Sequence, residues 1–206
     1  MTAKMRNMGE ACTAANRFLV HTSVSAEFAE KLAARMGALT VGRGQDDGTD
    51  VGPLIDEKAV ASVTKLVDAA VDAGASVVVG GTAHGGPGFF YPPTVLVDVP
   101  ADAEINREEI FGPVAPITTF ETEEDAVRMA NDTEYGLSSY AYTRDLARTI
   151  RLAESLDFGM VGVNTGLVSN PAAPFGGVKA SGFGREGGFE GIEEYLDTTY
   201  VALPAG

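Results

Sequence analysis

Cysteine, histidine and long apolar runs are all scarce in this sequence of 206 residues. Its single cysteine, Cys12, excludes an intrachain disulfide and any zinc or iron–sulfur site that needs several cysteines. The two histidines, His21 and His84, lie far apart and give little support for a metal site or a Ser-His-Asp triad. No segment approaches the roughly 18 consecutive apolar residues of a membrane span, and residues 1–10 contain no apolar stretch typical of a secretory signal. We therefore expect a cytoplasmic protein with no metal site and no membrane partner.

Basic residues are also few. The chain has 15 Lys and Arg against 29 Asp and Glu, a formal net charge of −14. Such a surface repels phosphate backbones, so we expect no nucleic-acid partner, although a local basic pocket could still bind a small anion. The acidity also favours solubility, which requires no cationic partner. Hydrophobic residues make up 45% of the chain, enough for a full core, which excludes a disordered protein.

Short apolar segments separated by amphipathic stretches predict alternating strands and helices. Strands are predicted over residues 17–22, 76–79, 95–99, 114–120, 138–142, 160–163 and 198–203. Helices are predicted over residues 25–39, 56–73, 122–129, 146–156 and 189–196, with a Gly- and Pro-rich loop over 170–188. This order favours an α/β fold with a mostly parallel sheet covered by helices. The spacing places Phe28, Val71, Leu146 and Ile150 on buried helix faces, and residues 76–79 in a buried strand.

Residues 1–17 show no clear strand or capped helix, yet they contain Cys12 and Arg6. Small neighbours around Cys12 leave room for a substrate carbon to reach the sulfur, and a thiolate is a strong nucleophile. The same cysteine could instead be a buried, inert thiol. Arg6 could bind a carboxylate or remain a solvated surface residue. Six positions apart on a helix, the two would not share a face, whereas an irregular segment could bring them into one pocket.

Two further segments carry candidate ligand contacts. Glu109 and Phe111 are two residues apart just before a predicted strand, so on extended backbone they would face one side and could contact a polar, flat ligand. An ordinary surface Glu109 and a core Phe111 are the alternative. Residues 182–187 (GFGREG) match the G-x-G-x-x-G pattern, but no strand precedes them and no acidic residue follows at the required distance. We therefore reject a dinucleotide fingerprint there.

Three segments in order resemble the aldehyde dehydrogenase family over essentially the whole chain. Residues 6–12 (RNMGEAC) are similar to its nucleophile segment, 109–113 (EIFGP) to its cofactor-contacting segment, and 174–186 (PFGGVKASGFGRE) to its C-terminal signature. Residues 55–60 and 161–170 further resemble the subgroup that acts on succinate semialdehyde. The resemblance implies an oxidoreductase that converts a small aldehyde with a distant carboxylate into its acid. It identifies Cys12 as the nucleophile, which passes through a thiohemiacetal and a thioester.

The resemblance also implies roles for other residues. Arg6 and Ser169 would hold the distant carboxylate, and Phe175 would form a wall of the aldehyde pocket. Glu109 would bind the nicotinamide ribose of NAD or NADP, with Phe111 beside the nicotinamide. Residues 1–196 would then be a catalytic domain of the aldehyde dehydrogenase type, and residues 197–206 a terminal strand that pairs with another subunit in a homo-oligomer.

Some family features have no counterpart in this sequence. Family members are longer, and the part that precedes Met1 normally holds most of the dinucleotide-binding domain, the oxyanion asparagine and the glutamate that activates water. Ala14 stands where some members have a second cysteine, which excludes a local redox disulfide. Two alternatives therefore stay open: a dehydrogenase acting on another carboxylated or amino aldehyde, and a catalytically incomplete fragment that acts at most as a subunit-interaction module.

Overall fold

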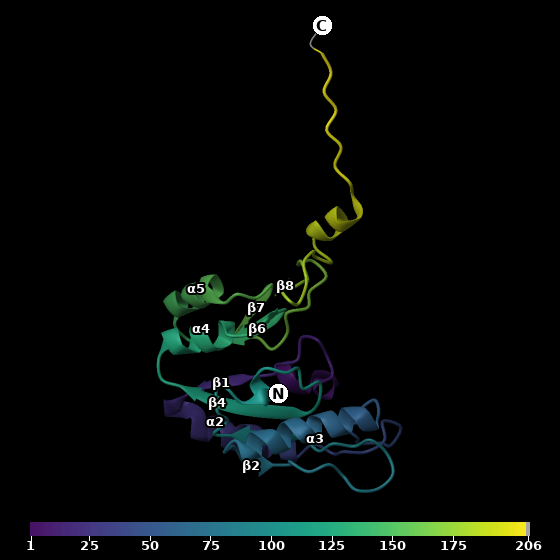
Figure 1. Cartoon of the computed structure of the whole chain (residues 1–206), viewed down its shortest axis with the longest axis vertical. Coiled ribbons are helices and arrows are strands. Elements are labelled where there is room, and N and C mark those ends of the chain that lie inside the picture. The colour runs from purple at the N-terminus through teal and green to yellow at the C-terminus, as the bar shows by residue number, and fades with distance from the viewer. Residues whose placement is uncertain (205–206) are drawn as a thin grey trace.

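The computed structural model describes residues 1–204, which form two lobes and a C-terminal segment that extends away from both (Figure 1). Lobe 1, residues 1–120, contains a four-stranded sheet in the order β1-β4-β3-β2. Its strands are β1 (Phe18–His21), β2 (Ser76–Val79), β3 (Thr94–Val97) and β4 (Val114–Phe120). Strand β4 pairs in parallel with β1 and β3, and β2 runs antiparallel to β3. The predicted mostly parallel sheet is therefore confirmed, with one antiparallel strand.

Strand β2 lies at the edge of this sheet, which corrects the expectation of a buried strand at residues 76–79. It has a neighbouring strand on one side only, so Val77 and Val78 remain 43% and 46% exposed.

Helices α2 (Ser25–Gly37) and α3 (Glu57–Asp72) cover opposite faces of the sheet in lobe 1. Adjacent strand residues point to opposite faces, and Val95 packs in the cluster with α2 whereas Leu96 packs in the cluster with α3. Helix α3 begins as predicted, because the Asp56 carboxylate accepts a hydrogen bond of 2.8 Å from the Ala59 N–H. Two helix residues expected inside are instead partly exposed, because they lie beside the buried stripe rather than in it: Phe28 (37%) and Val71 (41%).

Lobe 2, residues 121–196, contains two small sheets and two helices. Its elements are α4 (Glu123–Asn131), β5 (Tyr135–Gly136), β6 (Ser138–Ala141), α5 (Leu146–Ser155), β7 (Met160–Val163) and β8 (Val178–Lys179). Strands β6 and β7 pair in parallel, and β5 and β8 pair antiparallel. Glu123 on α4 forms ion pairs with Arg148 and Arg151 on α5, at 2.8 and 2.6 Å. The expected buried positions Leu146 and Ile150 are 75% and 53% exposed, because the narrow β6-β7 sheet covers only part of α5.

Both ends of the chain differ from their sequence-based expectations. The N-terminal segment does form helices, α1 (Thr2–Met5) and the 3₁₀ turn η1 (Arg6–Gly9). The predicted helix near 189–196 is a 3₁₀ helix, η4 (Glu190–Tyr195); shorter 3₁₀ turns are η2 (Thr22–Val24) and η3 (Glu104–Asn106). Residues 197–204 form no strand, because they extend away from both lobes and no neighbouring backbone pairs with them (Figure 1). The last two positions of the predicted 197–206 unit lie outside the described residues.

The centre of lobe 1 predicts a stability test. Ile117 on the central strand β4 is 1% exposed, so Ile117→Ala should lower the free energy of unfolding by about 2–5 kcal/mol through lost burial and a residual cavity. Thr119 lies two residues further along the same strand and is exposed, so Thr119→Ala should change the free energy of unfolding by about 0.5 kcal/mol or less. Urea unfolding of both variants checks this. Equal effects would show that β4 is not the centre of the core.

Candidate active site

A left-handed turn leads into the segment that contains Cys12. Asn7, Met8 and Gly9 have φ values of 49°, 49° and 89°. Positive φ at two consecutive residues other than glycine costs conformational energy and is concentrated at functional sites. The Glu10 N–H donates to the Asn7 carbonyl at 2.8 Å, and the Asn7 side-chain amide donates back to the Glu10 carbonyl at 2.6 Å. Two residues beyond the turn lies Cys12, whose thiol is free and exposed rather than buried in a core.

Gly9 brings this turn against a distant segment, residues 108–112. A Cβ atom at Gly9 would overlap the carbonyl oxygen of Gly112, so only glycine permits the two backbones to approach this closely. Within that segment Ile110 is 3% exposed, whereas Phe111 is 44% exposed and Glu109 is also exposed. Phe111 has φ 48°, so the backbone there is not the extended one used in the sequence argument. The buried Ile110 anchors the segment and leaves its two flanking side chains accessible.

Two further residues of the first segment contact residues 108–112. The Asn16 amide donates to the Glu108 carbonyl at 2.8 Å, and its side-chain oxygen accepts from the Ile110 N–H at 2.9 Å. Lys4 is 1% exposed and lies close enough to Glu109 for their charges to interact. Burial lowers the pKa of the Lys4 ammonium to about 7, and the negative charge of Glu109 acts in the opposite direction.

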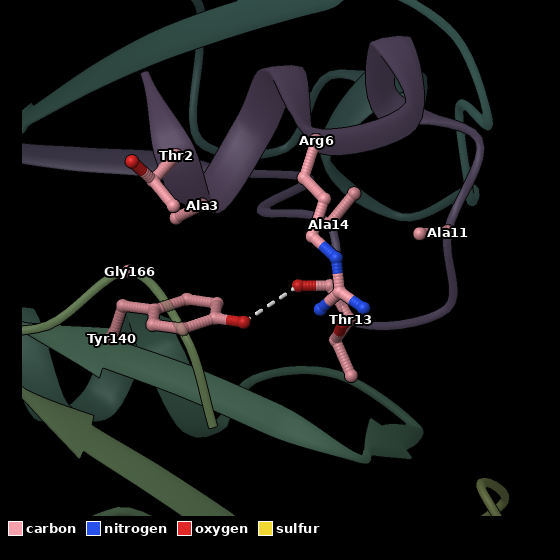
Figure 2. A pocket seen from close by; sticks show the side chains of 8 residues that line it. All are labelled: Thr2, Ala3, Arg6, Ala11, Thr13, Ala14, Tyr140 and Gly166. Carbon is pink, nitrogen blue, oxygen red and sulfur yellow. Dashed lines mark hydrogen bonds between the residues drawn. The ribbon is translucent and has the colours of Figure 1, made fainter. Parts of the chain in front are cut away.

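Arg6 lies beside a shallow depression between the two lobes, lined also by Ala11, Thr13, Tyr140 and Gly166 among others. Figure 2 shows the Arg6 side chain reaching toward the backbone of Thr13, with Tyr140 of β6 approaching the same point. The Tyr140 hydroxyl donates to the Thr13 carbonyl at 2.8 Å, and burial is the main cause that raises its pKa. Arg6 is exposed and forms no ion pair with any residue in the described part of the chain. Its guanidinium is free to bind an anion.

The structure separates Ser169 and Phe175 from this depression. Ser169 is exposed on the segment after β7, three residues beyond Gly166, which packs against α1. Phe175 is half-buried, and its backbone N–H and carbonyl both pair with Glu186 at 2.7 Å. Neither residue lines the depression beside Arg6. Arg6 and Cys12 flank the left-handed turn along the chain, and Glu109 lies close to Lys4, but neither Cys12 nor Glu109 lines the depression. Ser169 and Phe175 belong to loops of lobe 2.

Sequence reasoning missed three residues of this site. Lys4, Asn16 and Tyr140 all contact residues 108–112 or the segment around Cys12. A lysine or asparagine in a polar stretch gives no sequence signal for burial, and only the alternation of the predicted strand 138–142 indicated which way Tyr140 could point.

Among residues 1–204 no group of His, Cys, Asp and Glu side chains is arranged to hold a metal ion. No helix in that range combines the length and apolarity needed to cross a membrane.

The comparison with known proteins decides the family, since residues 1–201 match the aldehyde dehydrogenase family. The chain belongs to this family. A succinate-semialdehyde dehydrogenase of Paenarthrobacter nicotinovorans is 62% identical over 203 residues, which cover 98% of this chain and 45% of that protein. A glutarate-semialdehyde dehydrogenase of Pseudomonas aeruginosa is 51% identical over 203 residues, covering 98% of this chain and 42% of that protein.

A solved structure shows the same fold. The crystal structure of an NADP-dependent enzyme of Escherichia coli is 53% identical and superimposes with a TM-score of 0.92, covering 95% of this chain and 41% of that one. The aldehyde-dehydrogenase-like α/β fold expected from the sequence is thereby confirmed. This aldehyde dehydrogenase chain spans less than half the length of the relatives it matches.

The buried Lys4 predicts a pH-dependent stability. Its pKa is about 7 in the folded chain against an ordinary value of 10.5, so between these values the unfolded chain binds more protons and stability rises with pH. The rise should be on the order of 1 kcal/mol per pH unit, and stability should be lowest and level below the folded pKa. Lys4→Met should remove this slope, whereas Lys58→Met, on the exposed side of α3, should keep it. Urea unfolding between about pH 7 and 9.5 measures both slopes. An unchanged slope in Lys4→Met would refute the lowered pKa of Lys4 in the folded chain.

Proposed function

We propose that this chain carries the nucleophile, the carboxylate-binding arginine and part of the cofactor site of an NAD(P)-dependent succinate-semialdehyde dehydrogenase. The observation that carries the proposal is an exposed Cys12 that follows a strained turn, which begins after Arg6 and packs through Gly9 against residues 108–112. Relatives named for succinate and glutarate semialdehydes support a substrate that has an aldehyde at one end and a carboxylate at the other.

The chemistry begins at Cys12. Its thiolate attacks the aldehyde carbon, and the carbonyl π electrons move to oxygen, which gives a thiohemiacetal. The Cys12 backbone N–H can donate a hydrogen bond to that oxygen. When bound, NAD(P)+ supplies the hydride acceptor for the oxidation. The resulting thioester on Cys12 is hydrolysed by water, which releases the carboxylic acid and restores the thiol.

Glu109 and Phe111 fit a nicotinamide riboside. The exposed Glu109 carboxylate can accept hydrogen bonds from two ribose hydroxyls, and the 44% exposed Phe111 ring offers a surface for a flat heterocycle. On the substrate side, Arg6 would bind the distant carboxylate. Ser169 would add one hydrogen bond and Phe175 an apolar wall, provided that their loops approach Arg6 when the substrate is bound. NAD and NADP are both compatible with these residues.

Residues 197–206 are proposed to pair with a second copy of the chain. In the described part of this segment Tyr200, Val201 and Leu203 are 88%, 69% and 84% exposed, and extended backbone without a neighbour favours strand addition. Residues 1–196 would form the catalytic unit of such a homo-oligomer. The alternative function is an incomplete dehydrogenase fragment that acts at most as a subunit-interaction module, for which the same exposed segment is the supporting observation.

A chimera tests the nucleophile. In it, this chain replaces the matching 203 residues of the P. nicotinovorans relative. We expect the chimera to reduce NAD(P)+ with succinate semialdehyde, and Cys12→Ser to lower kcat by about a thousandfold or more, because a hydroxyl without a base is a poor nucleophile. This 206-residue chain on its own should show no steady-state turnover. An inactive chimera would favour the interaction module, and a fully active Cys12→Ser variant would exclude Cys12 as the nucleophile.

Arg6 should determine substrate choice in the same chimera. Arg6→Ala removes a charged hydrogen-bond donor from the carboxylate, so kcat/KM for succinate semialdehyde should fall about 10–150-fold. The kcat/KM for butanal, which has no carboxylate, should stay unchanged, and the kcat/KM for glutarate semialdehyde should fall as much as that for succinate semialdehyde. Arg43→Ala, in the exposed loop before α3, is the control and should leave kcat/KM for all three aldehydes unchanged. Equal losses with butanal and succinate semialdehyde would mean that Arg6 shapes the nucleophile turn instead.

A further inference from the structure

We propose that Asn16 is a positioning residue for the cofactor: its side chain sets where Glu109 and Phe111 lie relative to Cys12. The inference rests on the proposed function and assigns a role to a residue outside the expected site. Asn16 follows Cys12 by four residues and precedes β1, so it joins the nucleophile segment to the sheet.

The Asn16 side chain binds the backbone on both sides of Glu109. Its amide nitrogen donates to the carbonyl of Glu108 at 2.8 Å, and its oxygen accepts from the N–H of Ile110 at 2.9 Å. A donor and an acceptor used together fix the two peptide groups that flank Glu109, and so the direction in which its side chain leaves the backbone. The Ile110 N–H is bonded to this side chain and not to another backbone group, so regular secondary structure does not replace the contact.

The position of Asn16 itself is determined by its neighbours. The Ala15 N–H donates to the Ala3 carbonyl at 2.7 Å, which ties the segment to α1. Two residues after Asn16, Phe18 pairs with Ile117 of β4. Asn16 is therefore held in place by the sheet. Its two hydrogen bonds position residues 108–110, which lie before β4 begins at Val114.

A second asparagine, in lobe 2, makes a pair of hydrogen bonds of the same kind away from residues 108–112. Asn131, at the end of α4, donates to the Ser155 carbonyl at 2.7 Å and accepts from the Asp157 N–H at 2.9 Å. Both asparagines thus bind the residues on either side of a third, which is Glu109 in one case and Leu156 in the other. A purely structural clamp would behave alike at both places, so Asn131 is a matched control.

The experiment uses the chimera described above and three variants: Asn16→Leu, Asn16→Asp and Asn131→Leu. The dissociation constant for NADP+ and that for NAD+ are measured by titration calorimetry, together with KM, kcat and amide hydrogen exchange at Ile110. Asn16→Leu should weaken binding of the preferred cofactor and raise its KM by about tenfold, with kcat at saturation changed about threefold or less. Exchange at Ile110 should become faster.

Asn16→Asp retains the acceptor for the Ile110 N–H but loses the donor to Glu108. It should keep Ile110 protected and weaken cofactor binding less than Asn16→Leu, which also covers the case in which the leucine variant fails to fold. Asn131→Leu should leave cofactor affinity within about twofold of wild type while losing a comparable hydrogen-bond pair. Equal losses of cofactor affinity in Asn16→Leu and Asn131→Leu, or unchanged affinity in both Asn16 variants, would overturn the proposal.

The two proposals fail in different ways. A wild-type chimera that binds NAD(P)+ but oxidises no aldehyde would contradict the proposed function, and the effect of Asn16→Leu on cofactor binding would still decide the role of Asn16. A wild-type chimera that binds neither cofactor would overturn both.

Discussion

The close approach of two backbones at Gly9 and Gly112 is the constraint on which the candidate site depends. Any side chain at Gly9 would occupy the space of the Gly112 carbonyl, so the nucleophile turn and the 108–112 segment can meet only through glycine. To reach this position, the backbone adopts strained left-handed conformations at Asn7 and Met8. Parallel pairing of β1 with β4 provides the frame, since each strand carries one of the two segments at its N-terminal end.

Charge in the site opposes the charge of the whole chain. A net charge of −14 disfavours the approach of an anion, so the carboxylate substrate that we propose would have to be attracted locally. Arg6 has no carboxylate partner among the described residues and can serve this purpose. Lys4 is different: its ammonium is enclosed, its pKa is lowered to about 7, and its neighbour is Glu109. Arg6 is thus exposed and available to an anion, whereas Lys4 is buried and close enough to Glu109 for their charges to interact.

The two lobes contribute different parts of the site and are joined by polar contacts. The Tyr140 hydroxyl of lobe 2 donates to the carbonyl of Thr13, next to Cys12, and the Arg17 guanidinium of lobe 1 donates to the Met129 and Ala130 carbonyls near the end of α4 at 2.9 and 2.7 Å. These contacts join the two lobes close to Cys12, whereas Ser169 and Phe175 do not line the depression beside Arg6.

The sequence by itself determined the order of β1 to β4, β6 and β7 and of helices α2 to α5, the α/β class and the family, because periodicity and short motifs are local properties. It did not predict α1, β5 or β8. It placed the helix start at Asp56 correctly, since a cap depends on residues three positions apart. It did not reveal that β2 is an edge strand, that Leu146 and Ile150 are exposed, or that residues 197–204 lack a strand, because burial and pairing depend on what lies alongside. Only the tertiary structure brought Lys4, Asn16 and Gly9 against residues about 100 positions away. These contacts leave no local pattern, because each joins the side chain or backbone of one segment to the backbone or charge of another that is distant in sequence.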